Sequence, residues 1–180
     1  MNGTPVNHPR QRAIDGDEKY ARRHAILDAA ERLYDRAQAL PNVAEVADEV
    51  GLAKGTMYLY FTSKEAIYLA LHERHAQQFF AALNERLAQP TAFEFDAMAG
   101  LMDRYMISHK SFLPLCNACM SAPAERVEMA THEAFHTNLA LWMGQAGAGL
   151  ERHVPSLRPG DGVRLLHHGY ALMLGLHQLL

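Results

Sequence analysis

The chain is poor in cysteine and tryptophan and has no long hydrophobic run. It contains two cysteines and one tryptophan in 180 residues, and no apolar stretch approaches the roughly 20 residues that a helix needs to cross a bilayer. The first 19 residues, MNGTPVNHPRQRAIDGDEK, lack the hydrophobic core of a signal peptide. These absences exclude a membrane-spanning protein and predict a cytoplasmic one without a membrane partner.

An excess of positive charge is also missing. The formal net charge is −3, and residues 1–75 contain ten Lys and Arg against eleven Asp and Glu. Bulk charge therefore gives no indication of nucleic-acid binding. Contacts with phosphate depend on local placement, however, and cations such as Arg22, Lys54 and Lys64 can share one face while the acidic groups lie elsewhere.

The chain has enough apolar residues for a substantial core, because they make up 49% of it, but it is short for two independent domains. Its apolar patterns have helical spacing. We therefore expect an all-α protein in which a small N-terminal module is fused to a larger helical body. The expected boundaries are a mobile arm over residues 1–17, a helix-turn-helix module over 18–64 and the body over 65–180.

The most informative segment is VAEVADEVGLAKGTMYLYFTSK, residues 43–64, which contains two short helical patterns joined at one glycine. In the first, apolar residues recur at helical spacing over residues 43–50, and Asn42 with Glu45 three residues later forms a start signal. Gly51 supplies the left-handed residue that ends this helix.

The second pattern predicts a helix over residues 53–61, so soon after the first that only a sharp turn fits between them. Its outward face is rich in hydroxyl groups and cationic at its N-terminal end, which suits a DNA groove and phosphates. Gly55 costs a helix roughly 1 kcal/mol relative to alanine. A close approach of DNA to the backbone at this position explains why glycine stands there. Thr62 and Glu65 are expected to form a second capping box, with Lys64 in the next first turn as a phosphate anchor. The outward residues are Lys54, Gly55, Thr56, Tyr58 and Tyr60.

The segment GLAKGTMYLYFTSKEAIY resembles the recognition-helix signature of TetR/AcrR-family transcriptional regulators, and ARRHAILDAAERLY before it resembles their first helix. The resemblance covers about residues 21–69 and rests on many positions at matching spacing. In one departure, Pro41 and Asn42 stand where the family often has a threonine, which moves the cap and a phosphate contact onto Asn42. The expected DNA contacts are Lys54, Thr56, Tyr58 and Tyr60, with Arg22, Asn42 and Lys64 on phosphates.

The family resemblance implies a homodimeric, ligand-responsive transcriptional repressor and not an enzyme. The two recognition helices would enter successive major grooves of double-stranded operator DNA, and the two-fold symmetry of a palindromic operator requires a two-fold dimer. The dimer is expected to form through the last two long helices, over residues 124–153 and from about residue 161. A small molecule in the body would shift the helix over residues 63–88 and weaken DNA binding.

The body is expected to contain further helices over residues 93–108 and 112–121. Its methionines and aromatic residues more often serve a packed core, but together they fit a deformable cavity for an apolar or amphipathic effector. The last helix is apolar almost all round and is expected to be buried. It stops so abruptly at Leu180 that further residues are expected. The residues expected to line the pocket are Phe79, Met98, Met102, Tyr105, Cys116, Met120, Phe135, Leu139 and Trp142.

Two motifs leave an alternative open. His132, Glu133 and His136 fit the HExxH pattern of zinc hydrolases, in which the histidines bind zinc and the glutamate acts as a base. The chain has eleven histidines and no third ligand at a recognised spacing, so a solvated pair is favoured and a regulatory metal site comes next. Cys116 and Cys119 form one CxxC, either a buried apolar pair or a thiol or metal sensor. The alternative function is therefore a metal- or thiol-responsive regulator, and no cofactor or resident metal is assigned.

Overall fold

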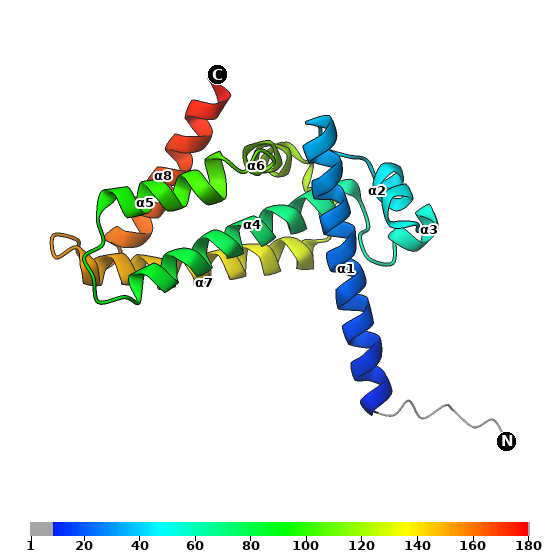
Figure 1. The fold of residues 1–180 in the computed structure, drawn as a ribbon, viewed down its shortest axis with the longest axis horizontal. Coiled ribbons are helices and arrows are strands. Elements are labelled where there is room, and N and C mark those ends of the chain that lie inside the picture. Colours follow the sequence, from blue (N-terminus) through cyan, green and yellow to red (C-terminus); the bar gives the residue numbers. More distant parts are fainter. Residues whose placement is uncertain (1–8, 180) are drawn as a thin grey trace.

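The computed structural model describes residues 9–179, which fold into helices without a strand (Figure 1). A small module at one end contains α1 (Pro9–Ala37), α2 (Val43–Val50) and α3 (Lys54–Met57). The body contains α4 (Lys64–Leu87), α5 (Phe95–Met102), α6 (Phe112–Ser121), α7 (Met129–His153) and α8 (Asp161–Gln178). A π-helical turn, η1 (Asp103–Ile107), follows α5, and a 3-10 turn, η2 (Ala124–Arg126), precedes α7. The all-α prediction is confirmed.

Both ends of α2 form as the sequence predicts. The Asn42 side chain accepts hydrogen bonds from the backbone N–H groups of Ala44 and Glu45 at 2.8 and 3.1 Å, and the Glu45 carboxylate accepts one from the Asn42 N–H at 2.7 Å. Gly51 ends the helix with φ 67°. Residues with a Cβ rarely adopt this conformation, so glycine allows the sharp turn towards α3.

The helix α3 is shorter than expected. It spans only Lys54–Met57, whereas a helix over residues 53–61 was predicted. The chain then continues in tight turns, because the N–H groups of Leu59 and Tyr60 bond to carbonyl groups three residues earlier, at 3.1 and 2.9 Å. Glycine, threonine and tyrosine are weak helix formers, which favours such turns over a longer α-helix.

Three other boundaries differ from the expectation. α1 begins at Pro9, so residues 9–17 of the expected arm are helical, while residues 1–8 lie outside the described part. Proline suits a first helical turn, where its missing N–H would have no helical partner in any case. The capping residue of α4 is Ser63 and not Thr62, since the Ser63 hydroxyl accepts the Ala66 N–H at 3.1 Å. α7 begins at Met129, five residues later than predicted, after the turn η2.

The molecule has one core in the module and one in the body, and α4 contributes to both. Ile26 of α1, Val46 of α2 and Met57 of α3 are fully buried in the module core together with the first turns of α4. The later turns of α4, from Phe79 to Leu87, belong to the body core, where α4 lies side by side with α7 (Figure 1). A shift of α4 would therefore disturb the packing of both parts.

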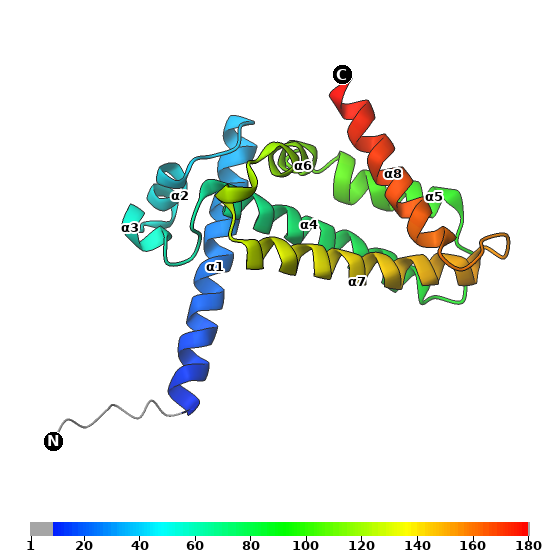
Figure 2. The ribbon, with the colours of Figure 1, turned by 180° about the vertical axis from the view of Figure 1, so that it is seen from behind.

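The last helix, α8, is less buried within the single chain than its apolar composition predicts. It crosses α7 and then extends away from it (Figure 2). Leu165, Leu172, Leu176 and Leu179 are 51 to 83% exposed, and Leu141 of α7 is 57% exposed. An apolar surface of this kind is unusual for a monomer. None of the described helices combines the length and the apolar character required to cross a membrane.

Candidate nucleic-acid interface

The N-terminal ends of α2, α3 and α4 line one shallow groove of about 380 Å³ on the module. Four of the residues expected to contact DNA lie there, namely Asn42, Lys54, Tyr58 and Lys64, and all four are exposed. Helix N-termini present backbone N–H groups and the positive end of the helix dipole, both of which attract phosphate. The groove therefore combines two lysines, a phenol and helix N-termini on one accessible surface.

The other residues expected at DNA are placed less uniformly. Gly55 is exposed, and a Cβ added there would meet no heavy atom within 4 Å, so the space in front of α3 is open. Thr56 and Tyr60 are half-buried, and Tyr60 packs against the module core. Arg22 is exposed on α1 but does not line the groove. The neighbouring Arg23 instead packs on the module, with its guanidinium 4.8 Å from the centre of the Phe61 ring.

Contacts behind the groove hold Asn42 and α2 in position. The hydroxyl of Tyr68 donates to the carbonyl oxygen of Pro41 at 2.9 Å. Burial, with the charges of Glu65 and Glu45, raises the pKa of Tyr68 to about 12, so this phenol keeps its proton. Glu49 joins α2 to α1, because its carboxylate accepts a hydrogen bond from the guanidinium of Arg36 at 2.5 Å. Helix α2 is thus anchored at both of its ends.

Arg126 is a groove residue that the sequence analysis missed. It belongs to η2, and the hydroxyl of Ser63 donates to its carbonyl oxygen at 2.6 Å. The two residues are separated by 63 positions in the chain. No local pattern around Arg126 indicates this proximity, because it depends on how the body folds back against the start of α4.

The residues expected to line a ligand pocket are mostly packed side chains of the body. Phe79 and Cys116 are buried in the body core, and Phe135 is buried in a smaller cluster beside it. Met120 is 67% exposed in the last turn of α6, so within the single chain it is not packed in the core with the other expected pocket residues. The remaining residues, Met98, Met102, Tyr105, Leu139 and Trp142, are half-buried and pack against the body core.

A small polar cluster lies within this apolar core. The Cys116 sulfur is 3.5 Å from Nδ1 of His72, and the Tyr170 hydroxyl is 3.5 Å from Nε2 of the same ring. Burial and the neighbouring His75 lower the pKa of His72 to about 4, so this imidazole is neutral at pH 7. Burial raises the pKa of Cys116 to about 12. All three groups are therefore uncharged and able to exchange hydrogen bonds.

The two motifs behind the alternative function have little support in the structure. His132 and His136 lie with Met129 in a groove of about 510 Å³ whose lining comes entirely from α7. Among the described side chains, those of residues 16–123 and 125–179, no third metal-binding side chain lies close to this pair, and a catalytic zinc site needs three protein ligands. Burial raises the pKa of Cys119, like that of Cys116, to about 12, which disfavours the reactive thiolate.

The short helices around an exposed cationic groove, joined to a larger helical body, define a helix-turn-helix DNA-binding protein. The family model "Bacterial regulatory proteins, tetR family" matches residues 26–71, which run from α1 into α4. Together with the relatives that are described below, this match shows that the chain belongs to the TetR family of bacterial regulatory proteins. The resemblance predicted from the sequence is confirmed, and the members of this family are DNA-binding transcriptional regulators rather than enzymes.

Three similar proteins are named as regulators. The HTH-type transcriptional regulator EthR of Mycobacterium tuberculosis is 31% identical over 132 residues, which are 71% of this chain and 59% of EthR. The HTH-type transcriptional activator FasR of Mycolicibacterium smegmatis is 32% identical over 71 residues, 39% of this chain and 32% of FasR. The fatty acid metabolism regulator protein of Bacillus subtilis is 33% identical over 86 residues, 42% of this chain and 44% of that protein. The chain thus spans less than two thirds of the length of these relatives.

Proposed function

We propose that the protein is a homodimeric, ligand-responsive transcriptional repressor that binds a palindromic operator. The observation that carries this proposal is the groove in which Asn42, Lys54, Tyr58 and Lys64 are exposed together at the N-terminal ends of three helices. Two lysines suit the phosphates on either side of a major groove, while the phenol suits base edges or sugars.

In the complex, α3 and the turns after it enter the major groove. The contacts come from Lys54, Thr56, Tyr58 and, after a rotation of its side chain, Tyr60. The open space in front of Gly55 lets the DNA backbone approach α3 closely. Lys64, Asn42, and Arg22 in the middle of α1 contact phosphates, and Arg126, which also lines the groove, joins them.

The dimer forms through α7 and α8. The exposed leucines of α8 and Leu141 of α7 supply the apolar surface that a stable interface needs. A two-fold axis through these helices would relate two groove surfaces, and each would occupy one half-site. Half-sites read by such dimers are about one helical turn apart, or a multiple of it, which is why a palindrome is expected.

The effector binds in the body between α4, α6 and α8. Apolar side chains such as Phe79 and Trp142 would surround its apolar part, and the neutral His72 and Tyr170 would receive a polar end. Because α4 belongs to both cores, opening the body core shifts the module. The Bacillus subtilis relative is named for fatty acid metabolism, so fatty acids and their thioesters are the first compounds to test.

The deciding experiment is a mobility shift of the purified protein with the DNA upstream of its own gene, with competitor DNA and a salt series. We expect a discrete complex with two protein chains per site. The logarithm of its affinity should fall linearly with the logarithm of salt concentration, with a slope of about −0.9 per phosphate contacted. A salt-sensitive smear without a preferred fragment would contradict specific recognition by this groove.

A further inference from the structure

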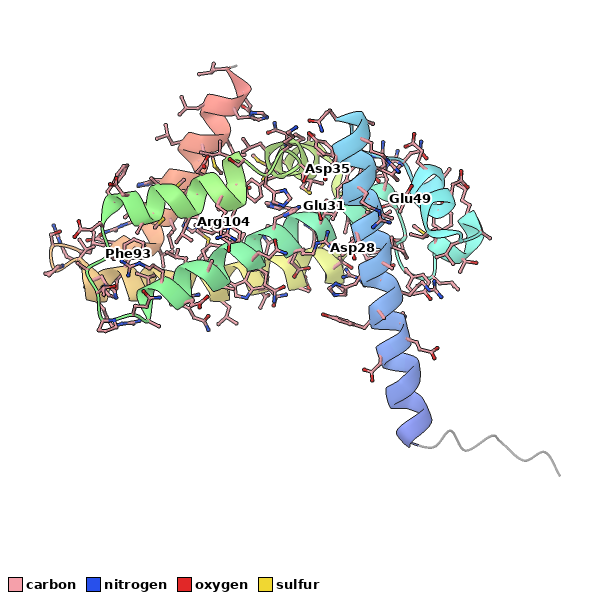
Figure 3. All side chains as sticks on the ribbon, in the orientation of Figure 1. Asp28, Glu31, Asp35, Glu49, Phe93 and Arg104 are labelled. Atoms are coloured by element: carbon pink, nitrogen blue, oxygen red, sulfur yellow. The ribbon has the colours of Figure 1, made fainter. Side chains whose placement is uncertain are left out.

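A second cluster of chemically active side chains lies where α1 meets the body. Glu31 of α1, His75 of α4 and His109 in the turn before α6 form a compact group of potential metal ligands, the one group of three found among the side chains that the structure describes, 16–123 and 125–179. Figure 3 shows Glu31 on the side of α1 that faces the body. His75 is buried, while Glu31 and His109 are half-buried, so the cluster lies just below the surface.

Two of the three distances between the ligand atoms fit one tetrahedral metal ion. Oε1 of Glu31 lies 3.2 Å from Nε2 of His75 and 3.5 Å from Nε2 of His109, and all three atoms are within 4.8 Å of one another. Zinc bonds to nitrogen and oxygen are roughly 2.0–2.2 Å long, which places tetrahedral ligands about 3.3–3.6 Å apart. The two carboxylate-to-imidazole distances therefore already match the edges of such a tetrahedron.

The Glu31 carboxylate has an oxygen that the protein does not satisfy. Oε1 is shielded from solvent and has no hydrogen-bond partner, although two imidazole nitrogens are close to it. A buried acceptor without a partner is costly, and such atoms in folded proteins generally have an explanation. A cation between the oxygen and the two nitrogens would satisfy Oε1 and would replace the 3.4 Å contact that Nε2 of His75 makes with the Ser111 hydroxyl.

The surrounding contacts orient the three side chains. Arg74 forms an ion pair with Oε2 of Glu31, which leaves Oε1 free, and pairs with Asp28 at 2.5 Å. The Ser111 hydroxyl lies 3.5 Å from Nδ1 of His109, the ring nitrogen that faces away from Glu31. Such outer contacts fix ligand orientation in metal sites.

The local charge also suits a divalent cation. Three carboxylates, those of Asp28, Glu31 and Asp35, lie along α1 at this junction (Figure 3). The cations to be compared with them are two, Arg74 and the exposed Lys110. Burial alone would raise the pKa of Glu31, but its contacts with His75, Arg74 and His109 lower that pKa overall, so the carboxylate is ionised at pH 7. Burial, followed by the proximity of His75, lowers the pKa of His109, which keeps a ring nitrogen lone pair available.

We propose that Glu31, His75 and His109 bind one divalent transition-metal ion, with zinc the best fit to two imidazoles and a carboxylate. Water would complete the tetrahedron, as in zinc sites with three protein ligands. The ion would join α1, in the DNA-binding module, to α4 and to the turn before α6. This site is distinct from the HExxH motif on α7.

The position of the ion has a regulatory consequence, which rests on the proposed function. If the ion favours one arrangement of the module against the body, metal and DNA must change each other's affinity by the same factor. The existence of the site does not depend on that function. Its test therefore uses metal binding without DNA, so that failure of the site and failure of the repressor proposal can be distinguished.

The experiment uses the full chain, purified without a histidine tag and stripped with a chelator. Zn²⁺ is titrated by calorimetry, and the visible absorption of bound Co²⁺ reports its coordination. We expect one equivalent of metal bound by the wild-type protein and by the matched control His132→Ala. In His109→Ala, affinity should fall by more than the roughly 10–100-fold typical of outer-shell changes.

Glu31→Gln provides a second variant of nearly unchanged shape. Zn²⁺ should raise the thermal midpoint of the wild-type protein and of His132→Ala but not that of Glu31→Gln, because only a ligand bound to the folded state stabilises it. Absence of stoichiometric binding by the wild-type protein would overturn the proposal. So would binding that survives in both His109→Ala and Glu31→Gln, or that is lost in His132→Ala.

Discussion

Gly162, at the start of α8, lies directly against the backbone of Gly147 in α7. A Cβ added to Gly162 would be 2.2 Å from the Gly147 carbonyl oxygen, and one added to Gly147 would be 2.6 Å from a methyl carbon of Val163. No side chain fits at such distances, and the obstacle at Gly162 is backbone that cannot rotate away. The two glycines therefore set how closely α7 and α8 approach at their crossing.

Gly162→Ala should lower the free energy of unfolding by about 1–3 kcal/mol, the usual cost of overpacking, as measured by urea denaturation. It should also weaken dimerisation in size-exclusion chromatography, because the proposed interface uses the same two helices. The control is Gly100→Ala in α5, where an added Cβ meets nothing within 4 Å. That variant should be neutral or more stable by up to about 1 kcal/mol. Equal effects of the two substitutions would contradict the close crossing.

Lys64→Ala should weaken operator binding on all sequences and reduce the slope of log affinity against log salt by about 0.9, the share of one phosphate. Lys64 is exposed in the first turn of α4, within the groove. Arg104→Ala removes the same charge from the body, where the exposed Arg104 lies beside the ring of Tyr105. Arg104→Ala should leave the slope of log affinity against log salt unchanged. If Lys64→Ala behaves like Arg104→Ala, Lys64 is not a phosphate anchor.

Asn42→Asp separates the capping role of this residue from its role at DNA. Aspartate caps helices about as well as asparagine, so stability should change by only a few tenths of a kcal/mol, whereas Asn42→Ala should lose about 1 kcal/mol. The new negative charge would face a phosphate and should weaken operator binding most at low salt. Operator affinity equal to the wild type in Asn42→Asp would remove this residue from the phosphate contacts.

The stability of the protein should depend on pH through His72. An unfolded histidine has a pKa near 6.5, whereas burial and His75 lower the pKa of His72 to about 4. The unfolded chain therefore takes up this proton first as the pH falls. The stabilising effect of the neutral ring is complete above about pH 6.5 and decreases towards pH 4, by up to about 1.4 kcal/mol per pH unit.

Urea denaturation at pH 7 and pH 5 checks this prediction. The wild-type protein should lose about 2 kcal/mol more between these pH values than His72→Asn does. The difference between the two proteins matters here, since other titratable groups contribute equally to both. Parallel losses would show that His72 is not buried in its neutral form.

The two thiols should be unreactive in the folded protein. Burial raises the pKa of Cys116 and of Cys119 to about 12, so only about one thiol in ten thousand is ionised at pH 8. Ellman's reagent should react slowly with the native protein and rapidly with two thiols per chain in urea. Rapid modification of the native wild-type protein, lost in Cys119→Ala, would instead favour a thiol-responsive regulator.

Features set by neighbouring residues were predictable from the sequence. Asn42, Glu45 and Gly51 define the ends of α2 as expected, because caps and left-handed turns involve atoms only a few residues apart. The length of α3 was not predictable in this way. Its apolar spacing fits a longer helix, but weak helix formers and contacts of Phe61 with the core decide where the helix ends.

Features that depend on tertiary packing could not be predicted from local sequence patterns. Arg126 reaches the groove only because η2 lies against Ser63. The three proposed metal ligands, Glu31, His75 and His109, come from separate elements and have no spacing along the chain that is typical of metal ligands. The HExxH pattern has such a spacing, but it lies on one exposed face of α7. Met120 shows the same limit, since its apolar character alone placed it in the pocket.

The brevity of α3 has a genetic consequence. Four residues cannot maintain a helix in water on their own, so the shape of the segment that we propose to contact DNA depends on Met57 and Phe61, which are almost fully buried beneath it. Substitutions at these two positions would touch no nucleotide and still abolish repression. A screen for constitutive expression should therefore recover temperature-sensitive alleles in the module core, alongside temperature-independent alleles at Lys54 and Lys64.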